Sequence, residues 1–173
     1  MMSRVEHSAV EARESWWRRR LLGPVLAQMT QGVSSERIAW TIALGMVLGV
    51  FPILGSTTLI CLLAGWVFRL NQPILFVFKT LVYPLHLALI LVFIHLGERL
   101  HGVPLIRFSI PQLLEKFKND PMRFVHDFGM AAWHGVSAWL LIAPLAVFLI
   151  KLAILPALRA MALSLERRKE ARS

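Results

Sequence analysis

Two groups of polar side chains interrupt the long apolar part of this sequence, and their types fit the binding of an anion. The first group follows a break in an apolar run and comprises Pro52, Gly55, Ser56, Thr57 and Thr58. Proline frees a backbone carbonyl, glycine permits a positive φ, and three hydroxyls stand at a helix N-terminus, which attracts anions. This pattern predicts a site for a phosphate or carboxylate headgroup. The alternative is a turn that serine or threonine caps.

The second group is a stripe of Lys79, Tyr83 and His86, which are spaced i, i+4 and i+7. This spacing places all three on one face of a helix. Titratable groups inside a membrane span are a functional hypothesis by default. The alternative is a lysine that snorkels to the cytoplasmic surface and a histidine with one hydrogen-bond partner. We predict that the two groups together form a site for a substrate or lipid.

No pattern in the sequence indicates catalysis or metal binding. The six histidines show no HxxxH or HExxH spacing, and the single cysteine, Cys61, lies in an apolar run. No glycine-rich phosphate loop or Ser-His-Asp set is present. No carboxylate falls inside a predicted span, which argues against a proton-coupled antiporter with a buried acid. We therefore expect no catalytic residue, no metal and no cofactor.

The composition excludes an ordinary soluble domain. Apolar residues make up 57% of the 173 residues and charged residues 17%. A small fold cannot hide that much apolar surface. The net charge of +9 does not indicate nucleic acid, because the arginines gather at the two ends of the chain. Basic flanks around apolar runs are typical of a membrane protein whose partners are anionic lipid headgroups.

The pattern divides the chain into a basic segment 1–32, a membrane domain 33–158 and a basic tail 159–173. Apolar residues mixed with arginines predict that the first segment is an interfacial helix or a solvated one. The hairpin 34–69 follows, and a helix start is predicted at Ser34-Ser35-Glu36. Its uncharged run 38–68 is broken into halves of 14 and 12 residues, whereas a span needs about 20. The hairpin is therefore either re-entrant or made of two tilted full spans.

Two longer spans complete the membrane domain. The first covers 73–97, with a kink expected at Pro84, and the second covers 129–151. Between them, the mixed loop 98–128 predicts two short amphipathic helices on the membrane surface. The fold class is therefore an all-α polytopic transmembrane protein with a hairpin broken by proline and glycine, two long spans and interfacial amphipathic helices.

Small residues in the first half of the hairpin predict close helix packing. Ala39 and Ala43 are four residues apart, and so are Gly45 and Gly49, which form a GxxxG motif. Such residues let two helices approach closely in lipid. The motif packs either in a homodimer or, as we favour, against 57–68 of the same chain. So few helices cannot enclose a sizeable pore, so we expect a homo-oligomer or a partner subunit in the membrane.

The flanking charges also predict the orientation. The N-terminal segment, the Arg69 turn and the tail are rich in positive charge, whereas 98–128 carries five positive and four negative residues. The positive-inside rule then places both termini in the cytoplasm and 98–128 outside, in the inner membrane of a bacterium.

An ordered set of short motifs resembles a known family. The motifs are Ser35-Glu36-Arg37-Ile38-Ala39, Gly45-x3-Gly49-x2-Pro52-x2-Gly55, Arg69-Leu70-Asn71-x-Pro73, Tyr83-Pro84-Leu85 and Leu96-Gly97. In this order they resemble the bacterial membrane family catalogued as domain of unknown function 2062, over roughly residues 15 to 155. The sequence departs from the family at two places: Tyr83 stands where an asparagine is expected, and Ser56-Thr57-Thr58 follows Gly55, where a longer polar side chain is common. The resemblance implies the architecture and leaves the mechanism open.

Two functions of different classes fit these observations. The first is a non-enzymatic component of the bacterial envelope that binds lipids or partner proteins. The second is a small transporter or lipid flippase that handles an anionic substrate at the hairpin tip, through Lys79 and its neighbours. The broken hairpin is the feature on which the second function depends.

Overall fold

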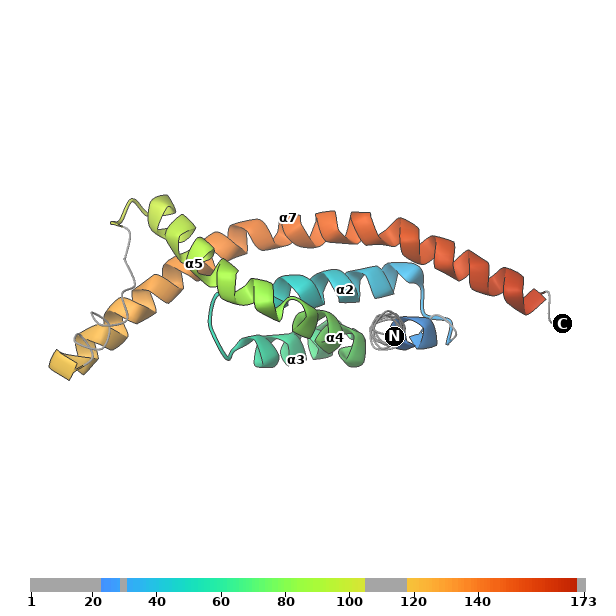
Figure 1. The fold of residues 1–173 in the computed structure, drawn as a ribbon, viewed down its shortest axis with the longest axis horizontal. Coiled ribbons are helices and arrows are strands. Elements are labelled where there is room, and N and C mark those ends of the chain that lie inside the picture. The colour runs from blue at the N-terminus through green and yellow to red at the C-terminus, as the bar shows by residue number, and fades with distance from the viewer. Residues whose placement is uncertain (1–22, 29–30, 105–117, 171–173) are drawn as a thin grey trace, which may run out of the picture.

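The computed structural model describes residues 23–28, 31–104 and 118–170, and every regular element in these ranges is a helix. A short helix at 23–28 precedes α2 (Ser35–Gly49), α3 (Thr57–Val67), α4 (Gln72–Leu81), α5 (Tyr83–Leu100) and α7 (Pro121–Glu170). In Figure 1, α7 runs the whole length of the molecule, α5 crosses it, and α2, α3 and α4 lie together beneath its middle. The predicted all-helical fold is confirmed for these ranges.

Local capping sets the helix starts. Ser34 is the N-cap of α2, where its side chain accepts a hydrogen bond from the backbone N–H of Arg37 at 3.4 Å. Asn71 does the same for α4, with 3.1 Å from its Oδ1 to the backbone N of Ile74. Asp120 accepts from the backbone N–H of Arg123 at 2.9 Å before α7 begins. The start at Ser34 confirms the helix start predicted there. Pro73 and Pro121 lie in the first turns of α4 and α7, where a missing backbone N–H breaks no helical bond.

The predicted span 73–97 is two helices in the structure. α4 ends at Leu81 and α5 begins at Tyr83, with Val82 as a turn between them. Pro84, expected to kink one helix, lies at the second position of α5. Proline has no backbone N–H to donate to the carbonyl four residues earlier, and its ring crowds that carbonyl, so the helix stops and starts again. α4 then packs mainly on α2, and α5 packs on α7.

α5 continues to Leu100, so Glu98 and Arg99 belong to a helix and not to the expected loop 98–128. The expected span 129–151 and most of the expected tail 159–173 are likewise one helix, α7, which has 50 residues and carries Pro144 and Pro156 inside it. At 1.5 Å per residue α7 is about 75 Å long, more than twice the hydrocarbon thickness. Of the two amphipathic helices expected in 98–128, the second is the beginning of α7. The first falls on 105–117, outside the described residues.

Two apolar clusters hold these helices together. One lies where α2, α3, α4, α5 and α7 meet, and in it the indole N–H of Trp139 donates to the carbonyl of Val47 at 3.3 Å. The other joins the short helix at 23–28, the first half of α2 and α4 to Leu155 and Leu158 of α7. α7 is therefore the common support against which the smaller helices pack.

Among the described residues, two helices are long and apolar enough to cross a membrane, Tyr83–Leu100 and the stretch Pro121–Arg167 within α7. Much of the apolar surface is also uncovered. α3 buries only Thr57, Cys61 and Gly65, which are four residues apart, and its other faces expose large side chains such as Trp66, at 78%. Large exposed apolar surfaces mark contact with lipid or with another protein. The expected interfacial helix of segment 1–32 falls mostly outside the described residues.

Candidate functional site

The turn between α2 and α3 is closed by its own side chains. Gly55 has a φ of +85°, which glycine adopts readily, and it is exposed. The hydroxyl of Ser56 donates to the carbonyl of Ile53 at 2.9 Å, and Ser56 therefore closes the turn without capping α3. Pro52 is buried beside Gly135 of α7. These residues give the turn its shape, and Pro52 anchors it to α7.

The first turn of α3 meets Lys79 of α4. The ammonium of Lys79 donates a short hydrogen bond to the hydroxyl of Thr58, 21 residues earlier in the chain. Lys79 also lies 5.5 Å from the centroid of the Phe76 ring. Its side chain therefore points to the hairpin tip and does not snorkel towards the Arg69 turn. Because α3 has no side-chain cap and no acidic residue in its first turn, Thr58 and Lys79 form a positive end to the helix.

Tyr83 and His86 extend this polar group into the start of α5. Their rings stack with centroids 6.0 Å apart. Tyr83 is half exposed, whereas His86 has only 1% of its surface exposed, and its Nδ1 is buried without a hydrogen-bond partner. Lys79 lies close enough for its charge to act on the His86 ring. We call Thr58, Lys79, Tyr83 and His86 the tip cluster.

The structure thus divides the predicted site residues into two sets. Those of the tip cluster come together from three helices. The remaining ones, Pro52, Gly55, Ser56 and Thr57, belong to the turn or to packing, and Thr57 is buried in α3. The prediction that Lys79, Tyr83 and His86 form a stripe on one continuous helix was wrong, because Val82 separates α4 from α5.

The small residues of α2 face helices of the same chain. Ala39 and Ala43 are fully buried. A Cβ on Gly45 would lie 2.7 Å from the carbonyl oxygen of Leu75, and one on Gly49 would lie 3.1 Å from the Cα of Lys79. The two glycines therefore let α4 approach α2, whereas the sequence pattern had suggested 57–68 as their partner. The approach at Gly49 also brings the backbone of Lys79 against the end of α2.

The crossing of α5 and α7 contains buried titratable groups that were not among the predicted site residues. A Cβ on Gly97 would overlap the backbone of His134. Glu98 is fully buried, and the rings of His101 and His134 have centroids 4.8 Å apart. The statement that no carboxylate lies in a span was wrong, because Glu98 lies within the candidate span Tyr83–Leu100. No group of three or more histidine, cysteine, aspartate or glutamate side chains in the described ranges is placed to hold a metal.

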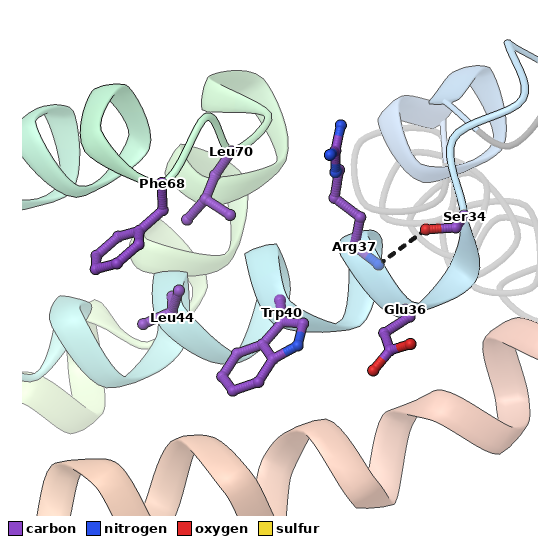
Figure 2. Close-up of a pocket in the computed structure, with 7 residues that line it drawn as sticks. All are labelled: Ser34, Glu36, Arg37, Trp40, Leu44, Phe68 and Leu70. Atoms are coloured by element: carbon purple, nitrogen blue, oxygen red, sulfur yellow. Dashed lines mark hydrogen bonds between the residues drawn. The ribbon is translucent and has the colours of Figure 1, made fainter.

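A groove of about 530 Å³ lies between the first half of α2 and the turn that leads into α4 (Figure 2). Polar and apolar side chains share its lining, namely Ser34, Glu36, Arg37, Trp40, Leu44, Phe68 and Leu70. This groove was not predictable from the sequence, because Phe68 and Leu70 meet α2 only after the hairpin has folded. The available signals are the helix start at Ser34 and the polar turn at Arg69, which by themselves predict only a cap and a connection.

Over the part of the chain that the structure describes, the fold and these two sites define an all-helical protein with two helices that could cross a membrane and polar groups among its shorter helices. Residues 16–166 match the family described as Uncharacterized protein conserved in bacteria (DUF2062), and the chain belongs to that family. The resemblance seen in the sequence is thereby confirmed. No curated protein and no solved structure matches the chain.

Proposed function

We propose that this chain is a non-enzymatic, integral protein of the bacterial inner membrane that binds the anionic headgroup of a lipid at the tip cluster. The observation that carries the proposal is the contact between Lys79 and Thr58. It places an ammonium group at an uncapped helix N-terminus. The ammonium group and the helix N-terminus both attract a negative charge.

No carboxylate of the described residues pairs with the ammonium of Lys79. The sequence contains no aspartate or glutamate between Glu36 and Glu98. A threonine hydroxyl accepts one of the three hydrogen bonds that an ammonium can donate and carries no charge. A lysine among apolar helices is costly unless its charge is compensated. A phosphate would compensate it and would also accept from the backbone N–H groups of the first turn of α3.

A transporter or lipid flippase is the second candidate, and the length of α2 favours it. This helix has 15 residues, which corresponds to about 22 Å, whereas the hydrocarbon layer is about 30 Å thick. If α2 enters from the cytoplasmic side, its end and the tip cluster lie within that layer. An anion held there would be partway across the membrane, as in transporters whose sites lie at broken helices near the midplane.

Binding is tested by replacing Lys79 with methionine, which keeps the length of the side chain and removes its charge. Native mass spectrometry of the purified protein with dioleoyl-phosphatidylglycerol gives the affinity. We expect Lys79→Met to bind this lipid about ten-fold more weakly, since one charge-assisted contact is lost. Lys118→Met, at an exposed lysine just before α7, is the matched control and retains the wild-type affinity. Equal affinity for wild type and Lys79→Met refutes the site.

The same variants separate the two candidate functions. Proteoliposomes that carry a fluorescent phosphatidylglycerol report flipping through dithionite reduction of the outer leaflet. Flipping that requires wild-type protein and is lost in Lys79→Met identifies a flippase. Lipid binding without flipping identifies a binding component of the envelope.

A further inference from the structure

The groove at the start of α2 has a charged rim. Glu36 and Trp40 point towards α7, and Arg37 points away from it (Figure 2). Lys151 of α7 donates to Oε1 of Glu36 at 2.7 Å and lies 4.5 Å from the centroid of the Trp40 ring. One wall of the groove is therefore held in place by a pair of opposite charges.

This pair leaves the rim with a net positive charge. Lys151 compensates the carboxylate of Glu36, and the positive charge of Arg159 also acts on it. No carboxylate of the described residues pairs with the guanidinium of Arg37, whose side chain is exposed. A guanidinium binds phosphate through two parallel hydrogen bonds, so Arg37 suits a phosphate better than a lysine would.

The rest of the groove is apolar. Leu44 and Trp40 come from α2, while Phe68 and Leu70 approach from the turn that leads into α4 (Figure 2). Phe68 has 62% of its surface exposed, so most of its ring has no protein contact. A volume of about 530 Å³ falls in the range of small-molecule sites, which are mostly apolar with a few polar groups. An occupant must therefore be anionic at one end and apolar at the other.

We propose that this groove binds one anionic phospholipid, with the phosphate on Arg37 and the start of an acyl chain between Trp40, Leu44 and Phe68. The groove lies at the first turns of α2, and the tip cluster lies beyond its last turn. The two sites are therefore separate, and lipid binding in the groove does not depend on the function proposed for the tip cluster. The ligand is a membrane lipid and not a soluble anion, because half of the lining can contact only an apolar group.

Native mass spectrometry with dioleoyl-phosphatidylglycerol tests the proposal in the purified full chain. Arg37→Gln removes the charge at an exposed position and should leave the fold intact. We expect this variant to lose one bound phosphatidylglycerol, with an affinity about ten-fold weaker at that site. Arg99→Gln, an exposed arginine at the end of α5, is the matched control and retains wild-type binding. An Arg37→Gln protein that binds the lipid as wild type does overturns the proposal.

A second variant and a competitor test the two halves of the groove independently. Phe68→Ser keeps Arg37 and removes apolar surface, so we expect weaker binding of phosphatidylglycerol here too, with an unchanged melting temperature because Phe68 is exposed. Glycerol 1-phosphate carries the headgroup without acyl chains and should not displace the lipid. Displacement by glycerol 1-phosphate or by inorganic phosphate would show a site for soluble anions and would overturn the lipid assignment.

The two proposed sites can fail separately. Lys79→Met affects only the tip cluster, and Arg37→Gln affects only the groove, so losses in the double variant should add. If Arg37→Gln loses one bound lipid while Lys79→Met loses none, lipid binding in the groove is supported and the function proposed for the tip cluster is refuted. If Lys79→Met loses one bound lipid while Arg37→Gln loses none, binding at the tip cluster is supported and the proposal for the groove is refuted.

Discussion

At the scale of single residues, Lys151 joins α7 to the start of α2. Its ammonium lies 2.7 Å from Oε1 of Glu36 and stands over the ring of Trp40. The hydrogen bond from Lys151, followed by its positive charge, holds the pKa of Glu36 below its usual value. Native Glu36 therefore binds a proton less readily than it does in the unfolded chain, and the pair stabilises the fold only while Glu36 is ionised.

This pair predicts how stability depends on pH. Its contribution is fully present above the usual glutamate value of 4.5 and is lost as the pH falls through the lowered pKa. We expect Glu36→Gln to have a lower melting temperature than wild type in detergent near neutral pH. The two proteins should melt alike once the pH is well below the native pKa. Glu166→Gln, at an exposed glutamate late in α7, is the control and should match wild type throughout. Identical melting of Glu36→Gln and wild type at neutral pH would contradict the role given to this pair.

For the tip cluster, the sequence predicted which residues form the site but not how they are arranged. Residue types identified Thr58, Lys79, Tyr83 and His86, because a lysine and a histidine among apolar residues are conspicuous. Their arrangement was not predictable, since the bond from Lys79 to Thr58 joins two helices 21 residues apart. That contact requires α4 to lie against α2, and the close approach at Gly45 is a property of the folded chain.

At the scale of helices, the sequence predicted starts better than ends. A start carries a local signal, such as the Ser34 cap of α2 or Asp120-Pro121 before α7. The predicted spans ended at formal charges, one at Gly97, just before Glu98, and the other at Lys151. A charge ends an apolar run and does not end a helix. Glu98 is buried within α5, which continues past it. Lys151 forms an ion pair with Glu36 of α2, and α7 continues past Lys151.

The crossing of α5 and α7 depends on Gly97, and this gives a prediction for the pair of helices. A Cβ at this position would overlap the backbone of His134, which cannot move without shifting α7. We expect Gly97→Ala to destabilise the protein by about 1–3 kcal/mol, the usual cost of overpacking. Thermal unfolding in detergent measures the effect.

Gly129→Ala is the matched control for this change. Gly129 also lies in a helix, α7, and nothing lies within 4 Å of a Cβ built on it. Alanine there should be neutral or slightly stabilising, because it favours helix more than glycine does. If Gly97→Ala and Gly129→Ala unfold at the same temperature as wild type, α5 and α7 do not cross as closely as this structure has them.

At the scale of the whole molecule, the unequal lengths of the helices predict how the chain would be placed in a membrane. α7 exceeds the hydrocarbon thickness by itself, whereas α2 has 15 residues and α3 has 11. If the start of α2 lies at the cytoplasmic surface, the hairpin tip ends within the membrane and the start of α7 emerges on the far side. The exposed apolar faces of α3 and α5 would then contact lipid on either side of the hairpin.

Single cysteines test this placement in intact cells with a membrane-impermeant thiol reagent, in a Cys61→Ala background. Leu54→Cys reports on the tip, because Leu54 is 65% exposed. This position is preferred to Gly55, whose positive φ would strain a cysteine. Met122→Cys, 80% exposed at the start of α7, should react from outside, and Leu163→Cys near its other end should react only after permeabilisation. We expect Leu54→Cys to resist labelling from outside and to react slowly when both sides are open, because a re-entrant tip lies within the lipid. Labelling of Leu54→Cys from outside as fast as Met122→Cys would show two full spans. The tip cluster would then face the periplasm, and the argument for a flippase would lose its support.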